Sequence, residues 1–156
     1  MMQDVSLFRP ILIFVALLAV AQATIVMLGV VFPDVPVPAF VNFLIVILAA
    51  MACGRAFAHT AERPPTFGET VLFSAIGVLM GLFVNVVFLA GLLISQGIPA
   101  TGDNLALSMT GAEVARGERA GFLVTGLALA FAIGLVLAIV GFGTGARQAL
   151  KTRRTA

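Results

Sequence analysis

The sequence predicts an all-α protein that folds as a four-helix transmembrane bundle. Hydrophobic residues make up 61% of the 156 residues, charged residues make up 10%, and the mean hydropathy is +1.15. So few polar side chains cannot cover the surface of a water-soluble domain of this length. Four apolar runs reach the length of about 20 residues that a helix needs to cross a bilayer. None of them alternates with the two-residue period that membrane β-strands require.

The chain is expected to form a single integral membrane domain over residues 1–156. Its spans are predicted at about residues 10–32, 38–58, 70–95 and 120–144, with a loop at 96–119 and a basic tail at 146–156. The first run resembles a signal peptide, because Ala21 and Ala23 form an Ala-x-Ala pattern. The chain stays apolar beyond this pattern as far as Phe32, so we interpret the run as a retained span.

A loop from Arg63 to Glu69 separates the second span from the third. Pro64 and Pro65 break the preceding helix, because proline lacks the N–H group and restricts the residue before it. Thr66 and Glu69 then have the spacing of a capping box, in which each side chain accepts a hydrogen bond from the backbone N–H of the other. This arrangement accounts for Glu69 without a catalytic role.

Lysine and arginine near the span ends predict the orientation, because their excess stays on the cytoplasmic side. Arg116 and Arg119 lie in the 96–119 loop, where acidic residues accompany them. Seven basic residues lie on the opposite side, namely Arg9, Arg55, Arg63, Arg147, Lys151, Arg153 and Arg154. Both termini and the central loop are therefore predicted to be cytoplasmic, in a multi-pass protein of the bacterial inner membrane.

The predicted outer loop holds the longest polar segment of the chain, residues 97–104, which is expected to be irregular because it is rich in turn formers. Thr110 and Glu113 repeat the capping-box spacing, so the last helix is predicted to begin near Thr110. Glu113 and Arg116 would then lie on one face of that helix.

Side chains that carry enzymatic chemistry are scarce within the predicted spans. Arg55 is the one ionisable residue there besides Cys53, and no nucleophile, base and orienting group occur together. His59 and Glu62 have a spacing that two metal ligands use, but no further ligand accompanies them. The formal charge of +2, with basic groups confined to loops and tails, argues against nucleic-acid binding. We therefore expect a protein that is not an enzyme and holds no cofactor or metal.

Two amide side chains, Gln22 and Asn85, fall at similar depths in the first and third spans. Proton-coupled transporters keep an ionisable group in the membrane, and an amide does not titrate. An interhelical hydrogen bond between Gln22 and Asn85 is the simpler interpretation. The alternative is that the two amides line a path for a solute.

Small residues recur along the third and fourth spans, where they allow helix backbones to approach closely in lipid. The third span carries Gly77 and Gly81, and the fourth carries Gly126, Ala130 and Gly134. A further pair, Gly141 and Gly145, is expected to face away from the bundle and to contact a partner protein or a second copy.

The central loop carries a motif of the form Arg-x-Pro-Thr-x-x-Glu at Arg63, Pro65, Thr66 and Glu69. With this motif the chain resembles an uncharacterised group of small bacterial inner-membrane proteins with four spans. The resemblance implies the four-span fold and the inner-membrane location, and it implies no activity. Residues 83–88 are also similar to small dual-topology fluoride channels, but the charge bias and the lack of that family's other motifs argue against membership.

These observations favour a non-enzymatic membrane protein that acts as an accessory or scaffold subunit through helix contacts. Its expected partners are the lipid bilayer and either another membrane protein or further copies of itself. The alternative is an oligomeric channel or facilitator for a small neutral solute, with Gln22 and Asn85 lining the path.

Overall fold

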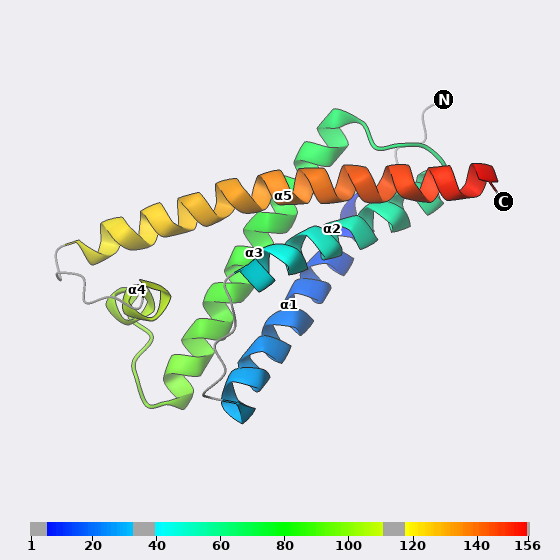
Figure 1. The fold of residues 1–156 in the computed structure, drawn as a ribbon. Helices are drawn as coiled ribbons and strands as arrows, with labels where there is room; N and C mark the ends of the chain where they lie inside the picture. The colour runs from blue at the N-terminus through cyan, green and yellow to red at the C-terminus, as the bar shows by residue number, and fades with distance from the viewer. Residues whose placement is uncertain (1–5, 33–39, 111–117, 156) are drawn as a thin grey trace.

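A computed structural model describes residues 6–32, 40–110 and 118–155 of the chain. These residues form five helices (Figure 1), which are α1 (Phe8–Val31), α2 (Phe40–Ala61), α3 (Phe67–Ser95), α4 (Gly102–Thr110) and α5 (Arg119–Thr155). Helices α1, α2, α3 and α5 are long and apolar enough to cross a membrane. The predicted all-α membrane fold with four spans is therefore confirmed.

The loop between α2 and α3, residues 62–66, lies at the same end of the molecule as the C-terminal end of α5 (Figure 1). Arg9, near the start of α1, lines a pocket together with His59 near the end of α2, so α1 begins at this end as well. The short helix α4 lies at the opposite end of α5 (Figure 1). We call the first of these the loop end of the bundle.

Helices α2 and α5 pack closely along two stripes of small residues. On α2 the stripe is Ala50, Gly54 and Ala58, and on α5 it is Gly141, Gly145 and Ala149, with every fourth residue in each case. All six residues are buried. A Cβ atom added to Gly54 would meet the backbone carbonyl of Phe142, and one added to Gly145 would meet the backbone carbonyl of Met51. Only glycine therefore allows the two backbones to come this close.

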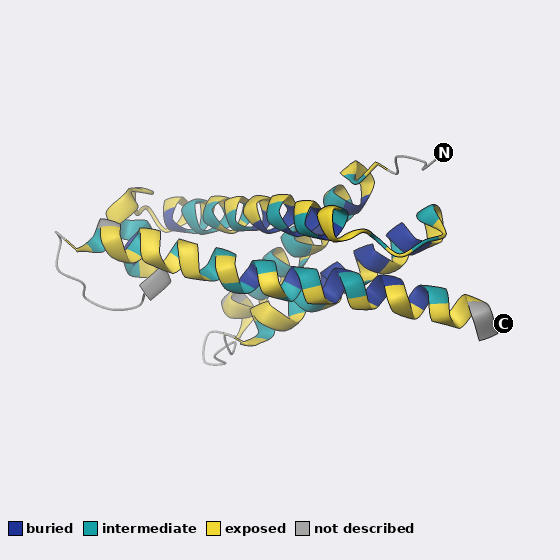
Figure 2. Ribbon diagram, turned by 90° about the horizontal axis from the view of Figure 1, so that it is seen from above, coloured by how far each residue is buried: buried dark blue, intermediate teal, exposed yellow. Residues whose placement is uncertain are grey.

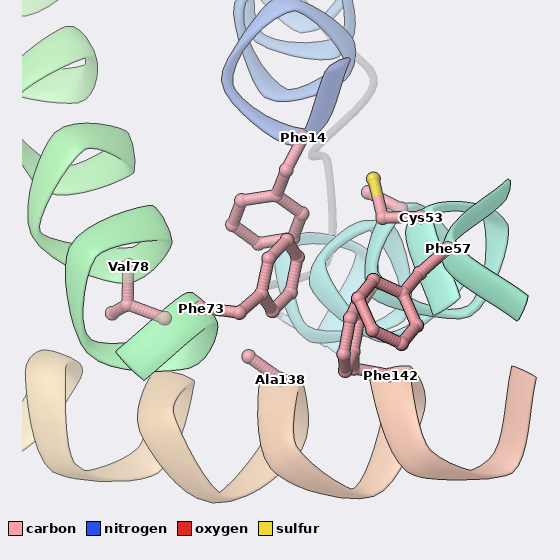
Figure 3. Close-up of a cluster of buried hydrophobic side chains, with 9 residues drawn as sticks. Phe14, Cys53, Phe57, Phe73, Val78, Ala138 and Phe142 are labelled. Atoms are coloured by element: carbon pink, nitrogen blue, oxygen red, sulfur yellow. The ribbon is translucent and has the colours of Figure 1, made fainter. Parts of the chain in front are cut away.

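Beside this seam lies a cluster of four fully buried phenylalanines, one from each spanning helix (Figure 3), namely Phe14, Phe57, Phe73 and Phe142. The rings of Phe73 and Phe142 stack with their centroids 4.1 Å apart. Phe14 meets Phe73 edge to face at 5.3 Å, and Phe57 lies 5.6 Å from Phe142. Stacked and edge-to-face pairs are favoured by the charge distribution of the rings, so this cluster joins all four spans.

The structure corrects the prediction that Gly141 and Gly145 face a partner. A Cβ atom on Gly141 would lie 2.8 Å from the Cβ atom of Ala50, so this face of α5 is covered by α2 of the same chain. Positions seven residues apart on a helix point in nearly the same direction, differing by about 20°. Gly141 therefore shares the inward face of Gly134, where a Cβ atom would meet the side chain of Val78 at 2.9 Å.

The prediction that Gly126 of α5 packs inside the bundle is wrong. It is exposed, and no atom lies within 4 Å of a Cβ atom built on it. Eight residues separate it from Gly134, which turns it by about 80° away from the inward face. Gly77 and Gly81, by contrast, contact the side chains of Phe14 and Leu18, and Ala130 lines a cavity inside the bundle.

Two predicted helix boundaries are also wrong. Thr110 does not start the last helix, because it is the final residue of α4, and α5 begins at Arg119. Helix α4 also takes up residues 102–104 of the segment that was expected to be irregular. The predicted pair of Glu113 and Arg116 lies outside the described residues. The predicted basic tail is helical, since α5 continues without a break to Thr155.

The glycine seam predicts opposite effects for two neighbouring substitutions. Gly145→Ala places a methyl group on the Met51 carbonyl and must separate α2 from α5, so we expect a loss of about 1–3 kcal/mol of unfolding free energy. Gly143→Ala is the control, because no atom lies within 4 Å of its Cβ position and alanine favours the helix. Unfolding in mixed detergent micelles measures both variants. Equal stabilities would contradict the close approach of the two helices.

Candidate functional site

The amide side chains of α1 and α3 meet between these two helices, where Gln22 is partly buried and Asn85 is exposed. Gln22 Nε2 donates a hydrogen bond to Asn85 Oδ1 over 2.9 Å, as predicted. A bond of this kind between membrane helices contributes about 0.6 kcal/mol on average. Each amide keeps further donor and acceptor capacity, because it offers two N–H groups and one carbonyl oxygen.

A cavity of about 80 Å³ adjoins this hydrogen bond. Its lining comes from all four spanning helices and includes a third amide, Asn42 of α2, together with Gln22 and Asn85. Apolar and small residues such as Leu18, Gly81 and Ala130 complete the wall. The volume is enough for a few water molecules or one small solute. Three amides from three helices thus give a polar spot between the spanning helices, with Gln22 partly buried and Asn42 and Asn85 exposed.

Asn42 was missed in the sequence analysis. The residue lies third in α2, close to the end of its apolar run, where a polar residue is typical of a helix entering the membrane interface. A signal was nevertheless present, because Asn42 stands between Val41 and Phe43 in an otherwise apolar segment. Its proximity to the other two amides depends on how α2 packs, and the sequence pattern does not show this.

The predicted capping box at the start of α3 is present. The backbone N–H of Glu69 donates to Thr66 Oγ1 over 3.3 Å, and the backbone N–H of Thr66 donates to Glu69 Oε2 over 2.7 Å. Glu62, the first residue of the loop between α2 and α3, has a φ of 53°, a left-handed conformation that ends α2 and reverses the chain. The loop therefore has a defined conformation at both of its ends.

Arg63 adds a contact that the sequence analysis did not identify. Its guanidinium group makes two parallel hydrogen bonds to Glu69, from Nη1 to Oε2 at 2.8 Å and from Nη2 to Oε1 at 2.7 Å. The side chains of Arg63 and Glu69 are 29% and 19% exposed, so the ion pair is partly shielded from solvent. Arg63 also lies 5.7 Å from the centroid of the buried Phe57 ring. Three of the four motif positions, Arg63, Thr66 and Glu69, thus form one fastening between the loop, α3 and the core, whereas Pro65 lines a neighbouring groove.

The polar side chains at the ends of α2 and α5 bond to one another. Arg55 Nη2 donates to Gln148 Oε1 over 2.8 Å. The Arg153 guanidinium lies 3.1 Å from His59 Nδ1 and 3.5 Å from Glu62 Oε1. A cation beside His59 opposes metal binding at that ring nitrogen. Among the described residues, no three or more His, Cys, Asp and Glu side chains lie together as a metal site would require.

Comparison of the chain with known protein families, with curated proteins and with solved structures gives no match. The polar features described above are therefore interpreted from their own geometry. The amide-lined cavity lies between the spanning helices, and the loop contacts of Arg63 and Glu69 lie at the loop end.

The double hydrogen bond between Arg63 and Glu69 predicts a measurable coupling. In a cycle of Arg63→Ala, Glu69→Ala and the double variant, we expect a coupling of about 1 kcal/mol in unfolding free energy, because the pair is bidentate and partly shielded. Glu69→Ala should also destabilise more than Thr66→Ala, which removes one cap at a cost of about 0.5–2 kcal/mol.

The matched control for this cycle is the ion pair of Arg153 and Glu62. Its 3.5 Å contact has side chains that are 45% and 78% exposed, so we expect a coupling close to zero. A coupling for Arg63 and Glu69 as small as that of the control would show that the loop fastening does not stabilise the fold.

Proposed function

We propose that this protein is a non-enzymatic membrane subunit that acts as an accessory or scaffold protein through contacts between helices. The observation that carries the proposal is the first part of α5, which leaves small residues uncovered on a helix of 37 residues. Such a helix is about 55 Å long, nearly twice the hydrocarbon thickness of a bilayer. The other spanning helices cover mainly its second part.

Three small residues on α5, Gly121, Thr125 and Gly126, are exposed. No atom of the described chain lies within 4 Å of a Cβ atom built on either glycine. Figure 2 shows the same asymmetry, since the first part of α5 is mostly exposed and the buried residues gather toward its C-terminal end. In lipid, a small residue gains little unless another helix packs against it. The expected contact surface therefore moves from Gly141 and Gly145 to this first part of α5.

A second candidate function is supported by the amide-lined cavity. Asn42, Gln22 and Asn85 offer donors and acceptors to a small neutral solute, and their helices surround the cavity together with α5. A channel or facilitator would need this cavity to connect with both sides of the membrane. The hydrogen bond between Gln22 and Asn85 spans two helices and would have to open during passage.

The orientation and location of the protein belong to the same proposal. The loop end carries basic residues on several elements, among them Arg9, Arg63 and Arg147, whereas Arg119 at the other end faces Asp103 at 4.0 Å. This asymmetry supports a cytoplasmic loop end in a bacterial inner membrane, as the resemblance of the Arg63 to Glu69 motif also implies. A reporter fused after Arg63 reads the orientation directly. We expect a cytoplasmic signal, and an external signal would show that the orientation is the opposite of the one proposed.

A substitution in α5 tests the helix-contact function. Gly121→Leu with Gly126→Leu should remove the native protein from a larger complex after gentle extraction, while its thermal unfolding stays unchanged because neither site has neighbours to displace. The control is Gly29→Leu with Gly91→Leu, which fills two equally open sites on α1 and α3. The complex is measured by its size in native electrophoresis.

Three outcomes contradict this assignment. The native protein runs as a monomer, the α5 variant keeps the complex, or the control variant loses it as well. Flux of small neutral solutes into liposomes by the pure protein, abolished by Asn42→Leu, would instead establish the second candidate function.

A further inference from the structure

A groove of about 630 Å³ lies between the start of α3 and the second part of α5, at the loop end of the bundle. Its volume is in the range of about 300–1,000 Å³ that ligand sites usually have. One wall is formed by α5, and the other by the loop prolines and the first turn of α3. The amide-lined cavity is a separate space with different lining residues.

The α5 wall changes from apolar to cationic along the helix axis. Ile139, Gly143, Arg147 and Lys151 all line the groove, and each lies four residues after the previous one. Successive residues at this spacing lie about 6 Å apart along the axis and turn by about 40° around it, so the four form a stripe that winds slowly around α5. The groove thus passes from an apolar side chain, through an open position at Gly143, to two basic side chains within about 18 Å. No atom lies within 4 Å of a Cβ atom built on Gly143.

The opposite wall is apolar and accessible. Phe67 is 81% exposed, and Pro64 and Pro65 lie beside it. The described residues that line the groove include no carboxylate. The nearest carboxylate in the sequence, Glu69, already accepts hydrogen bonds from Arg63 and Thr66. Among the described residues that line the groove, Arg147 and Lys151 carry the charge, so this lining is positive, and α3 adds the positive end of its helix dipole at Phe67.

We propose that this groove binds one anionic phospholipid. The headgroup phosphate lies between Arg147 and Lys151, and an acyl chain runs along Gly143 and Ile139 toward the membrane centre. The order of the lining groups supports this occupant as well as their charge, because the cations and the apolar surface follow one another along α5 as the phosphate and the hydrocarbon do along a phospholipid. Basic pockets between membrane helices are known to recognise anionic headgroups in this way. The proposal is independent of the helix-contact function.

The test uses the full chain in mild detergent with equal amounts of phosphatidylglycerol and phosphatidylcholine, and native mass spectrometry counts the retained lipids. We expect one phosphatidylglycerol to be retained preferentially. Arg147→Gln should lower its retention about fivefold, which corresponds to about 1 kcal/mol for one basic group near a lipid surface. Arg9→Gln is the matched control, because it removes the same charge from an exposed site outside the groove.

A second variant tests the acyl-chain position. Gly143→Leu should fill the groove and lower the retention of phosphatidylglycerol without lowering the thermal stability. Gly91→Leu, on α3 with equally open surroundings, should leave retention unchanged. Glycerol phosphate, which has the headgroup charge and no acyl chain, should not displace the bound lipid.

Each contrary result overturns the proposal. Equal retention of both lipids shows that the groove has no charge preference, and an equal loss for Arg147→Gln and Arg9→Gln shows general surface attraction. Displacement by glycerol phosphate assigns the site to a free phosphate group. Occupation by a protein helix with no bound lipid assigns it to a partner.

Discussion

The close approach of α2 and α5 sets the positions of most other parts of this protein. Their backbones come into contact at Gly54, Gly141 and Gly145, where there is no side chain to keep them apart. In water, the burial of large apolar side chains would hold two helices together, but lipid is as apolar as those side chains. Dispersion contacts between closely spaced backbones then become the main attraction available. A methyl group at any of these glycines forces the helices apart, so the seam allows a single register.

The polar contacts at the loop end and the amide pair of α1 and α3 both follow from this register. At the loop end, the seam brings the C-terminal part of α5 alongside the end of α2, which aligns Arg55 with Gln148. The same part of α5 forms one side of the groove. Phe142 extends from the seam into the cluster of rings and so positions α1 and α3. With these two helices in place, Gln22 reaches Asn85. The membrane-embedded amides and the groove are thus consequences of one packing arrangement.

The sequence predicts what depends on neighbouring residues or on composition. Hydropathy locates the four spans, and the capping box from Thr66 to Glu69 is a local pattern of four residues that the structure reproduces. Contacts between different helices are harder to predict from the sequence. Arg63 and Glu69 are six residues apart with two prolines between them, so no helical spacing links them. Gly141 was assigned to the wrong face because a stripe of every fourth residue rotates around the helix, whereas alternate steps of three and four stay on one face.

The most direct test of the seam is the distance between α2 and α5 in a bilayer. Spin labels at Arg55→Cys and Gln148→Cys, in a chain that also carries Cys53→Ala, report on two exposed positions whose native side chains are hydrogen-bonded at 2.8 Å. Diluting labelled protein with unlabelled protein isolates the signal that arises within one chain. We expect strong dipolar broadening that persists when the labelled protein is diluted. If the broadening disappears on dilution, or if no broadening is seen at any ratio, the α2–α5 seam is contradicted.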